Sequence, residues 1–461
     1  MKTNLYFHHA MHKLITVAFA GLFGIYSLVA GVREVKTEKA ENFQPVLRFT
    51  VCSDVHLSKE ESGLKNAEKF KKMFDVAYGI AEKSEYKSLD AVLVAGDMTD
   101  GGRAEEYEVY RDLTAEYVRE GTELLTVMGN HEHIEYRDTK NPQKAIEVFK
   151  EYVSDEVDFH KVIGGYHFIG VSYDDNGKEE FKTKLEWLRA ELDKAVADTG
   201  DKPIFVMQHP HPALTVYGSV NWANMDIRVV LKDYPQVVDF SGHSHYAAND
   251  PRSIHQSTFT AIGCGAITGA MGNLSYISGD EYGDGESSTF WLCEVDKDGN
   301  IRLRLYDVVS DCFFEDVDYF LKDVGNKKNR TYTWSRMMAQ DTAPTFPKEA
   351  KITAATDKKG EVSITFPEAS GYYRAENYKI TLSSNGEAKQ NMVVLSDYTR
   401  AVDFEKTVNF GQLSEGQYTV KIRAFSPYAK RGDTLEWGFS VDKKGNIEAE
   451  TVQDTTTEKI K

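Results

Sequence analysis

The chain has 461 residues, of which 41% are hydrophobic and 12% aromatic, so it is long enough for two or three domains with sizeable cores. The net charge of −17 argues against a nucleic-acid-binding surface, because a phosphate backbone attracts clustered Lys and Arg. We therefore expect no nucleic-acid scaffold as a partner, whereas bound cations would suit this charge.

Residues 1–31 have the order of a secretory signal peptide. Lys2 and Lys13 precede an uncharged apolar run over residues 14–31, and the small residues Ala30 and Gly31 at the end of this run suit cleavage. The run is also long enough to be an uncleaved N-terminal membrane anchor. Both interpretations predict an extracytoplasmic protein, either secreted or anchored through residues 14–31.

The four cysteines do not define a disulfide framework. An even number permits two bridges in an exported protein, but the spacing favours no pairing and none is assigned. Cys52 lies in an apolar run and is expected to be a buried thiol.

Between residues 45 and 320, short apolar runs alternate with helical patterns. Strands are expected within 46–56, 89–100, 122–132, 202–212 and 236–245, with further strands between 258 and 309. Helices are expected over 64–83, over 104–121 with its end at a glycine, and over 185–196. The first of these places one apolar face on Leu64, Ala67, Phe70, Phe74, Ala77 and Ala81. Such alternation predicts crossover units and a largely parallel sheet core.

The helical period disappears beyond a proline-containing stretch at residues 341–350. Strict alternation of apolar residues then recurs within 361–366, 378–382, 418–424 and 435–441, which predicts a small all-β sandwich over 345–442. The step from Leu413 to Tyr418 resembles the tyrosine corner of a fibronectin type III domain, which implies a surface or glycan partner. Residues 443–461 are polar and are expected to form a disordered tail.

Metal-capable side chains follow five of the apolar runs at the point where each run ends. They are Asp54 and His56, Asp97, Asn130 and His131, His209 and His211, and His243 and His245. The carboxyl ends of strands form the binding crevice of open α/β sheets, so these five loops should converge. In an extended segment residues i and i+2 point the same way, so Asp-x-His and His-x-His can each serve one site. Such oxygen and nitrogen donors suit Mn, Fe or Zn, and there are enough for two ions.

Together these motifs resemble the calcineurin-like metallophosphoesterase superfamily over about residues 46–310. The matching elements are Asp-x-His, Gly-Asp-x-x-Asp, Gly-Asn-His-Glu, a His after a strand, and Gly-His-x-His. The resemblance implies an α/β fold, a four-layer αββα sandwich over 45–320, followed here by the small immunoglobulin-like sandwich. It also implies two divalent or trivalent metal ions and a phosphoester substrate.

The resemblance further implies a role for each residue. Asp54, His56 and His245 would bind the first metal, Asn130, His209 and His243 the second, and Asp97 would bridge them. His131 would contact the phosphate together with Asn130 and act as general acid, oriented by Glu132. Asp100 would support the site from outside the ligand set; purple acid phosphatases, of the same superfamily, carry a metal-binding Tyr there. Pro210 breaks the family's His-x-Pro pattern, so His211 is the alternative to His209, which we favour because it comes first after the strand.

The function implied is hydrolysis of phosphomonoesters or phosphodiesters by a metal-bridging hydroxide, without a side-chain nucleophile. One alternative is a cell-surface binding module with a vestigial or structural metal centre, although its ligand set is complete. Another is a nucleotidase-type enzyme, although those carry a large nucleotide-binding domain.

Other segments are less informative. The stretch 215–226, with Tyr217 and Trp222, is either the lip of a substrate pocket or a packed loop, and the glycine-rich stretch 261–273 suits the floor of the site. Solvated side chains are expected at Arg103, His133 and Arg137, with phosphate contact as the alternative. Solvated or hydrogen-bonded side chains are expected at His8, His9, His12, His160 and His255.

Overall fold

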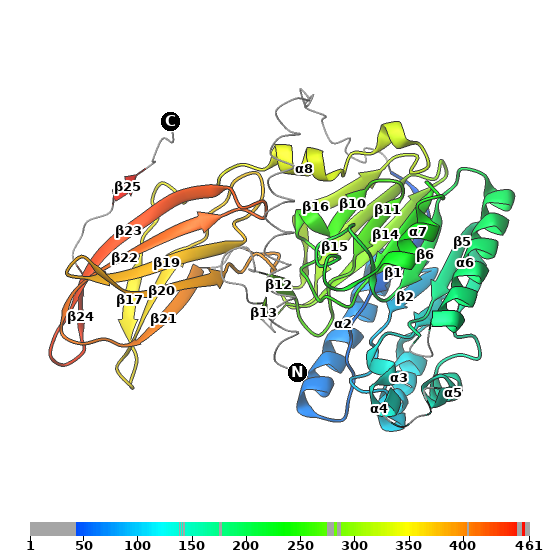
Figure 1. Ribbon diagram of the computed structural model, residues 1–461, viewed down its shortest axis with the longest axis horizontal. Coiled ribbons are helices and arrows are strands. Elements are labelled where there is room, and N and C mark those ends of the chain that lie inside the picture. The colour runs from blue at the N-terminus through cyan, green and yellow to red at the C-terminus, as the bar shows by residue number, and fades with distance from the viewer. Residues whose placement is uncertain are drawn as a thin grey trace.

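The computed structural model describes residues 43–449, except 138, 140, 142, 175–177, 274–280, 284–286 and 403–404, and also residues 454–456. The predicted signal or anchor segment lies outside these residues. An α/β part and an all-β part lie side by side (Figure 1). None of the helices in the described part of the chain combines the length and apolar character needed to span a membrane.

The first sheet of the α/β part has six strands in the order β16-β15-β14-β1-β2-β3. The first three strands of the chain pair in parallel, and a later antiparallel meander extends the sheet beyond β1. Its strands are β1 (Pro45–Cys52), β2 (Ala91–Ala95), β3 (Glu123–Val127), β14 (Thr289–Asp296), β15 (Ile301–Asp307) and β16 (Cys312–Leu321).

The second sheet also has six strands, in the order β10-β11-β9-β6-β5-β4. Its four central strands are parallel, and an antiparallel strand closes each edge. Its strands are β4 (Phe159–Ile163), β5 (Tyr166–Val171), β6 (Ile204–Gln208), β9 (Val237–Ser241), β10 (Ile254–Gln256) and β11 (Thr260–Gly263).

The two sheets pack face to face through aromatic side chains. The ring of Phe49 in β1 lies 5.2 Å from that of Phe168, 4.8 Å from that of Phe205 and 6.1 Å from that of Phe240, all three in the second sheet. Edge-to-face contacts of this kind favour aromatic pairs beyond the area they bury. The core between the sheets therefore fixes how their strand ends meet.

Helices cover the outer face of each sheet, which agrees with the predicted four layers. Phe70 and Phe74 of α2 join the core cluster of Val92 and Val94, and Leu188 of α6 packs in a second cluster with the other sheet. The α-helices are α2 (Glu61–Lys83), α3 (Ala104–Tyr117), α4 (Ile134–Arg137), α5 (Gln143–Tyr152), α6 (Lys178–Thr199), α7 (Met225–Leu231) and α8 (Trp334–Gln340).

Two details of the predicted helices are wrong. Leu64 is 52% exposed, because the helix lies on the sheet through the other members of the predicted apolar face. The helix expected to end at Gly121 ends at Tyr117, where the backbone of Val118 turns extended.

Short elements connect the main ones. They are η1 (His131–His133), η2 (Pro251–Ser253), η3 (Lys327–Asn329), β7 (His211–Pro212), β8 (Ala223–Asn224), β12 (Met271–Asn273) and β13 (Glu281–Gly283).

The all-β part consists of the sheets β17-β18-β21 and β20-β19-β22-β23-β24, with β25 also paired to β23. Every apolar residue of the four predicted alternating runs is buried in one core cluster. Tyr418 Oη donates to the carbonyl of Ser414, four residues upstream, at 2.9 Å. The strands are β17 (Thr353–Thr356), β18 (Glu361–Pro367), β19 (Asn377–Ser384), β20 (Glu387–Leu395), β21 (Glu405–Gln412), β22 (Gly416–Phe425), β23 (Arg431–Val441), β24 (Ile447–Ala449) and β25 (Asp454–Thr456).

The predicted polar tail 443–461 is not wholly irregular. Within it, β24 and β25 both pair antiparallel with β23, so backbone hydrogen bonding extends past the predicted boundary.

Candidate metal centre

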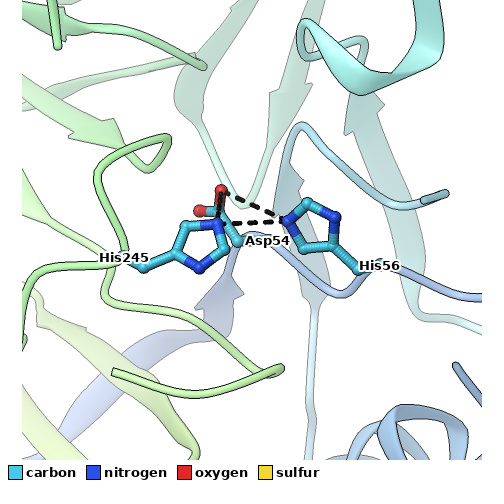
Figure 2. A group of neighbouring side chains, drawn as sticks. All are labelled: Asp54, His56 and His245. Atoms are coloured by element: carbon cyan, nitrogen blue, oxygen red, sulfur yellow. Dashed lines mark hydrogen bonds and ion pairs between the residues drawn. The ribbon is translucent and has the colours of Figure 1, made fainter. Parts of the chain in front are cut away.

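One group of metal-capable side chains joins the loops that follow β1 and β9. His245 Nε2 lies 3.1 Å from Asp54 Oδ1 and 3.1 Å from His56 Nε2. Figure 2 shows both imidazoles turned toward the Asp54 carboxylate from opposite sides. The ligand atoms of the three residues lie within 4.8 Å of one another, as a shared ion requires.

A second group lies beside the first. His209 Nε2 is 3.0 Å from Asp97 Oδ2 and 3.1 Å from Asn130 Oδ1, and the His243 ring centroid is 4.9 Å from that of His209. Asp97 Oδ2 is also 3.9 Å from His56 Nε2. Asp97 thus lies between the two groups, and the structure brings all seven predicted ligands together.

The ligand loops share an uncommon backbone conformation. Asp54, His56, Asp97, His243 and His245 all have positive φ, between 51° and 71°. Residues other than glycine rarely occupy this left-handed region, and each costs about 1–3 kcal/mol that the surrounding structure must offset. The strand ends are therefore held by the rest of the fold in the conformation that turns these side chains toward one centre.

Two glycines of the motifs are required by close packing against ligand residues. A Cβ on Gly242 would overlap Ser53 Oγ and the carboxylate of Asp54, and a Cβ on Gly129 would overlap the carboxylate of Asp97. The glycine of each Gly-His and Gly-Asn pair therefore allows one loop to pack closely against a predicted ligand residue of another loop.

Glu132 has a different role from the predicted one. Its buried carboxylate accepts hydrogen bonds from the backbone N–H groups of Asp97, Thr99 and Gly129 and from the Thr99 hydroxyl, at 2.6–3.0 Å. Its hydrogen bonds therefore tie together the loops after β2 and β3 rather than hold the ring of His131. Burial and the nearby Asp97 raise the pKa of Glu132 to about 7, against the effect of these donors.

The His131 ring is oriented instead by the backbone of Asp100. His131 Nδ1 lies 2.7 Å from the Asp100 carbonyl oxygen and donates to it, so Nε2 faces the centre, 3.9 Å from Asp97 Oδ2. The side chain of His131 is 30% exposed. The Asp100 carboxylate lies outside the ligand groups, 3.7 Å from His56 Nδ1, which lowers the pKa of Asp100.

His211 is not directed at the centre. Its two ring nitrogens contact the hydroxyls of Ser241 and Ser244 at 2.9 and 2.8 Å. Burial, and secondarily His243, lowers the pKa of His211 to about 3, so the ring is neutral. The structure thus places His209 at the centre and uses His211 to brace the loop that carries His243.

Buried charge makes the centre suited to cations. Burial alone would raise the pKa of both carboxyls, but His245, His209 and His56 hold the pKa of Asp54 well below its usual range. Likewise, His209 outweighs burial and lowers the pKa of Asp97 to about 2, while Asp97 raises the pKa of His209 to about 9 despite burial. Two carboxylates with imidazole and amide donors are a chemically complete set for two borderline cations.

An open cavity of about 470 Å³ adjoins the centre on the side of His56, His131 and His245. Thr268 and Ala270, from the predicted glycine-rich floor, line it together with Asn66 of α2. Asn66 donates to the His56 carbonyl and to the Thr268 hydroxyl, a role that sequence reasoning missed because the residue lies within a helix.

Trp222 and Tyr217, suggested as the lip of a substrate pocket, have different surroundings. The Trp222 ring lies edge-on to His243, with centroids 5.1 Å apart, and is 37% exposed beside the centre. Tyr217 instead hydrogen-bonds to Glu376 of the all-β part at 3.1 Å. Arg103 pairs with Glu106 at 2.7 Å, where it caps α3.

Replacing Gly242 by Ala should weaken metal binding by about tenfold or more, the usual effect of displacing groups that hold ligands. The added Cβ must push Asp54 or Ser53 out of place. Gly263→Ala is the matched control, because its Cβ would meet Ser253 at an ordinary 3.5 Å. Calorimetric titration of both metal-free variants with Mn²⁺ measures the effect; equal affinities would contradict it.

Metal binding should release protons. With a pKa of about 9, His209 carries a proton at pH 7 that a cation must displace, so affinity should rise with pH by about tenfold per unit for each proton lost. Titration with Mn²⁺ in weakly buffered solution at pH 6, 7 and 8 measures the release. Mn²⁺ binding without proton release at pH 7 would show either that His209 is not protonated in the metal-free protein or that it does not bind the metal.

A comparison with protein families agrees with this geometry. Residues 47–247 match the family model described as calcineurin-like phosphoesterase, whereas a comparison with curated proteins gave no match. Among solved structures, a purple acid phosphatase, PPD1, from yellow lupin (Lupinus luteus) seeds aligns at a TM-score of 0.41 and 12% identity, covering 60% of this chain and 54% of that chain. An engineered protein aligns at a TM-score of 0.19 and 12% identity, covering 81% of this chain and 68% of that chain.

The alignment thus spans little more than half of the lupin phosphatase. The family match over residues 47–247 agrees with the resemblance predicted from the motifs. The chain thus contains a calcineurin-like phosphoesterase domain over residues 47–247.

Proposed function

We propose that this domain holds two divalent or trivalent cations and hydrolyses phosphomonoesters or phosphodiesters. The observation that carries the proposal is the convergence of seven oxygen and nitrogen donors from five loops, with Asp97 between the two groups. Asp54, His56 and His245 would hold one cation, and Asn130, His209 and His243 the other. Bound cations of this kind supply Lewis acidity and an ionised water near neutral pH.

The residues of the chain then position the ester and move one proton. His131 reaches the centre from a partly exposed position, and its Nδ1–H is fixed by the Asp100 carbonyl. Its Nε2 is therefore the nitrogen free to give a proton to the leaving oxygen. Glu132 keeps the loops after β2 and β3 in register, so that Asp97 and His131 keep their spacing.

Space for the ester is available on two sides of the centre. The cavity beside His56 and His245 takes one arm, and the exposed Trp222 ring beside His243 offers an apolar surface for a second. A monoester needs one of these sides and a diester needs both. We propose that the enzyme accepts both classes.

We also propose export and a fibronectin type III-like identity for the all-β part. The order of basic, apolar and small residues in 1–31 supports export, with cleavage or anchoring as the two forms. The hydrogen bond from Tyr418 Oη to the Ser414 carbonyl is the geometry of a tyrosine corner and supports the domain type.

The test of the function is a phosphoester panel with the full chain loaded with Mn²⁺, Fe or Zn²⁺. Para-nitrophenyl phosphate and its bis-ester should both be hydrolysed, and Asp97→Asn should abolish turnover because it removes the carboxylate between the two groups. Asp239→Asn is the matched control, because Asp239 is equally buried but is not one of the seven donors, and burial raises its pKa. No turnover of any ester by the metal-loaded wild type would overturn the proposal and favour a binding module.

His131→Asn should slow the hydrolysis of alkyl phosphates by about 10²- to 10⁴-fold, the range for loss of a positioned acid. The loss should be smaller for para-nitrophenyl phosphate, whose leaving group needs little protonation. Steady-state kcat on both esters, with Mn²⁺ content as the loading control, measures the difference. Equal losses on both esters would show that His131 binds phosphate without donating a proton.

A further inference from the structure

The loop that supplies His243 and His245 continues into the contact with the all-β part. Between β9 and β10 it passes through Asp250 and Arg252, both largely buried. Arg252 Nε and Nη2 donate to the two carboxylate oxygens of Asp250 at 2.7 and 2.6 Å. This bidentate pair fixes the far end of the ligand loop.

The all-β part adds a second carboxylate to this pair. Glu376, fully buried, accepts from Arg252 Nη2 and from Tyr217 Oη. The Arg252 guanidinium also lies 3.8 Å from the centroid of the Tyr217 ring. We call Asp250, Arg252 and Glu376 the interdomain ion network. In this network the Arg252 guanidinium pairs with two buried carboxylates, one from each part of the chain.

Tyr398, also of the all-β part, holds the same loop from another direction. Its hydroxyl donates to Asp250 Oδ2 at 3.2 Å, and its carbonyl accepts from Asn249 Nδ2 at 2.7 Å. Its ring packs in an apolar cluster with Ala247, two residues after His245, and with Ala270 of the cavity wall. Polar and apolar contacts from the all-β part thus reach within a few residues of a proposed ligand.

These contacts matter because the ligands they approach are strained. His243 and His245 have φ of 71° and 55°, and such conformations persist only where the surroundings impose them. On the other side, the His245 carbonyl accepts from Met271 N at 2.6 Å, and Ala247 N donates to the Met271 carbonyl. The loop is therefore fixed at one flank by the cavity wall and at the other by the all-β part.

We propose that Glu376 is a positioning residue of the metal centre: through the interdomain ion network, the all-β part fixes the loop of His243 and His245 and raises metal affinity. The inference rests on the proposed function. Glu376→Gln leaves Arg252 paired with Asp250 but weakens the charge-assisted hydrogen bond that ties Arg252 to the all-β part, so the loop gains alternative conformations. The all-β part is then a component of the catalytic unit rather than an appended module.

A second contact between the two parts provides the matched control. Arg400 Nε donates to Asp307 at 3.1 Å and Arg400 Nη2 to the Ser310 hydroxyl at 2.9 Å, at the turn between β15 and β16. This contact also joins the all-β part to the α/β part, but it lies on a turn that carries none of the proposed ligands. Arg400→Gln therefore removes a contact between the two parts whose partners, Asp307 and Ser310, lie outside the ligand loop.

The experiment compares Glu376→Gln with Arg400→Gln in the full chain, in metal-free protein titrated calorimetrically with Mn²⁺. Glu376→Gln should raise the Kd for Mn²⁺ roughly 3- to 30-fold, the range for residues that act on ligands from a distance. It should also increase hydrogen exchange over residues 242–253 in the metal-free protein. Arg400→Gln should leave both quantities as in the wild type.

Tyr398→Phe, which removes only the hydroxyl on Asp250, keeps the test decisive if Glu376→Gln does not fold; it should raise the Kd in the same direction by a smaller factor. An unchanged Kd in the folded variants, or equal changes in Arg400→Gln, would overturn the inference and leave the proposed function intact. Absence of Mn²⁺, Fe and Zn²⁺ binding by the wild type would overturn both.

Discussion

Two carboxylates, Asp54 and Asp97, are buried where the ends of the two sheets meet, and the rest of the structure follows from that constraint. A buried charge is costly unless it is paired, and the ionic contacts of these two are with imidazoles. The motifs around them serve this pairing. Left-handed backbone at the strand ends turns the imidazoles inward, and Gly242 and Gly129 remove the Cβ atoms that would keep the loops apart.

A third buried carboxylate, that of Glu132, has a structural role. It receives three backbone N–H groups and one hydroxyl, so it fixes the shape of two loops. Its neighbour His131 has Nδ1 bound to a carbonyl and Nε2 3.9 Å from Asp97 Oδ2, and the residue lines the open cavity. Adjacent residues of one Gly-Asn-His-Glu motif thus have different roles: Glu132 holds two loops together, and His131 is the proton donor that we propose.

The sequence predicted those features that depend on residues close together in the chain. Alternating apolar residues predicted the all-β strands because every second side chain of a strand faces the same core. The polar residues after apolar runs predicted that the seven proposed ligand residues lie close together. Features that depend on contacts between residues distant in the sequence were not predicted. Glu132 faces the amide of Asp97, Tyr217 faces Glu376, and Leu64 faces solvent, because each depends on what the fold brings opposite.

The contact between the two parts of the chain combines two kinds of interaction with different consequences. The apolar cluster of Ala247, Ala270, Leu395 and Tyr398 favours association but tolerates sliding, since apolar contacts have no direction. The ion network around Arg252 has fixed geometry, because a guanidinium fork fits its carboxylates in one arrangement. A loop in a strained conformation needs the second kind, because only directional contacts can favour one backbone state over nearby ones. The position of Arg252 seven residues after His245 therefore places a directional interaction of the interface on the loop that supplies a proposed ligand to each half of the centre.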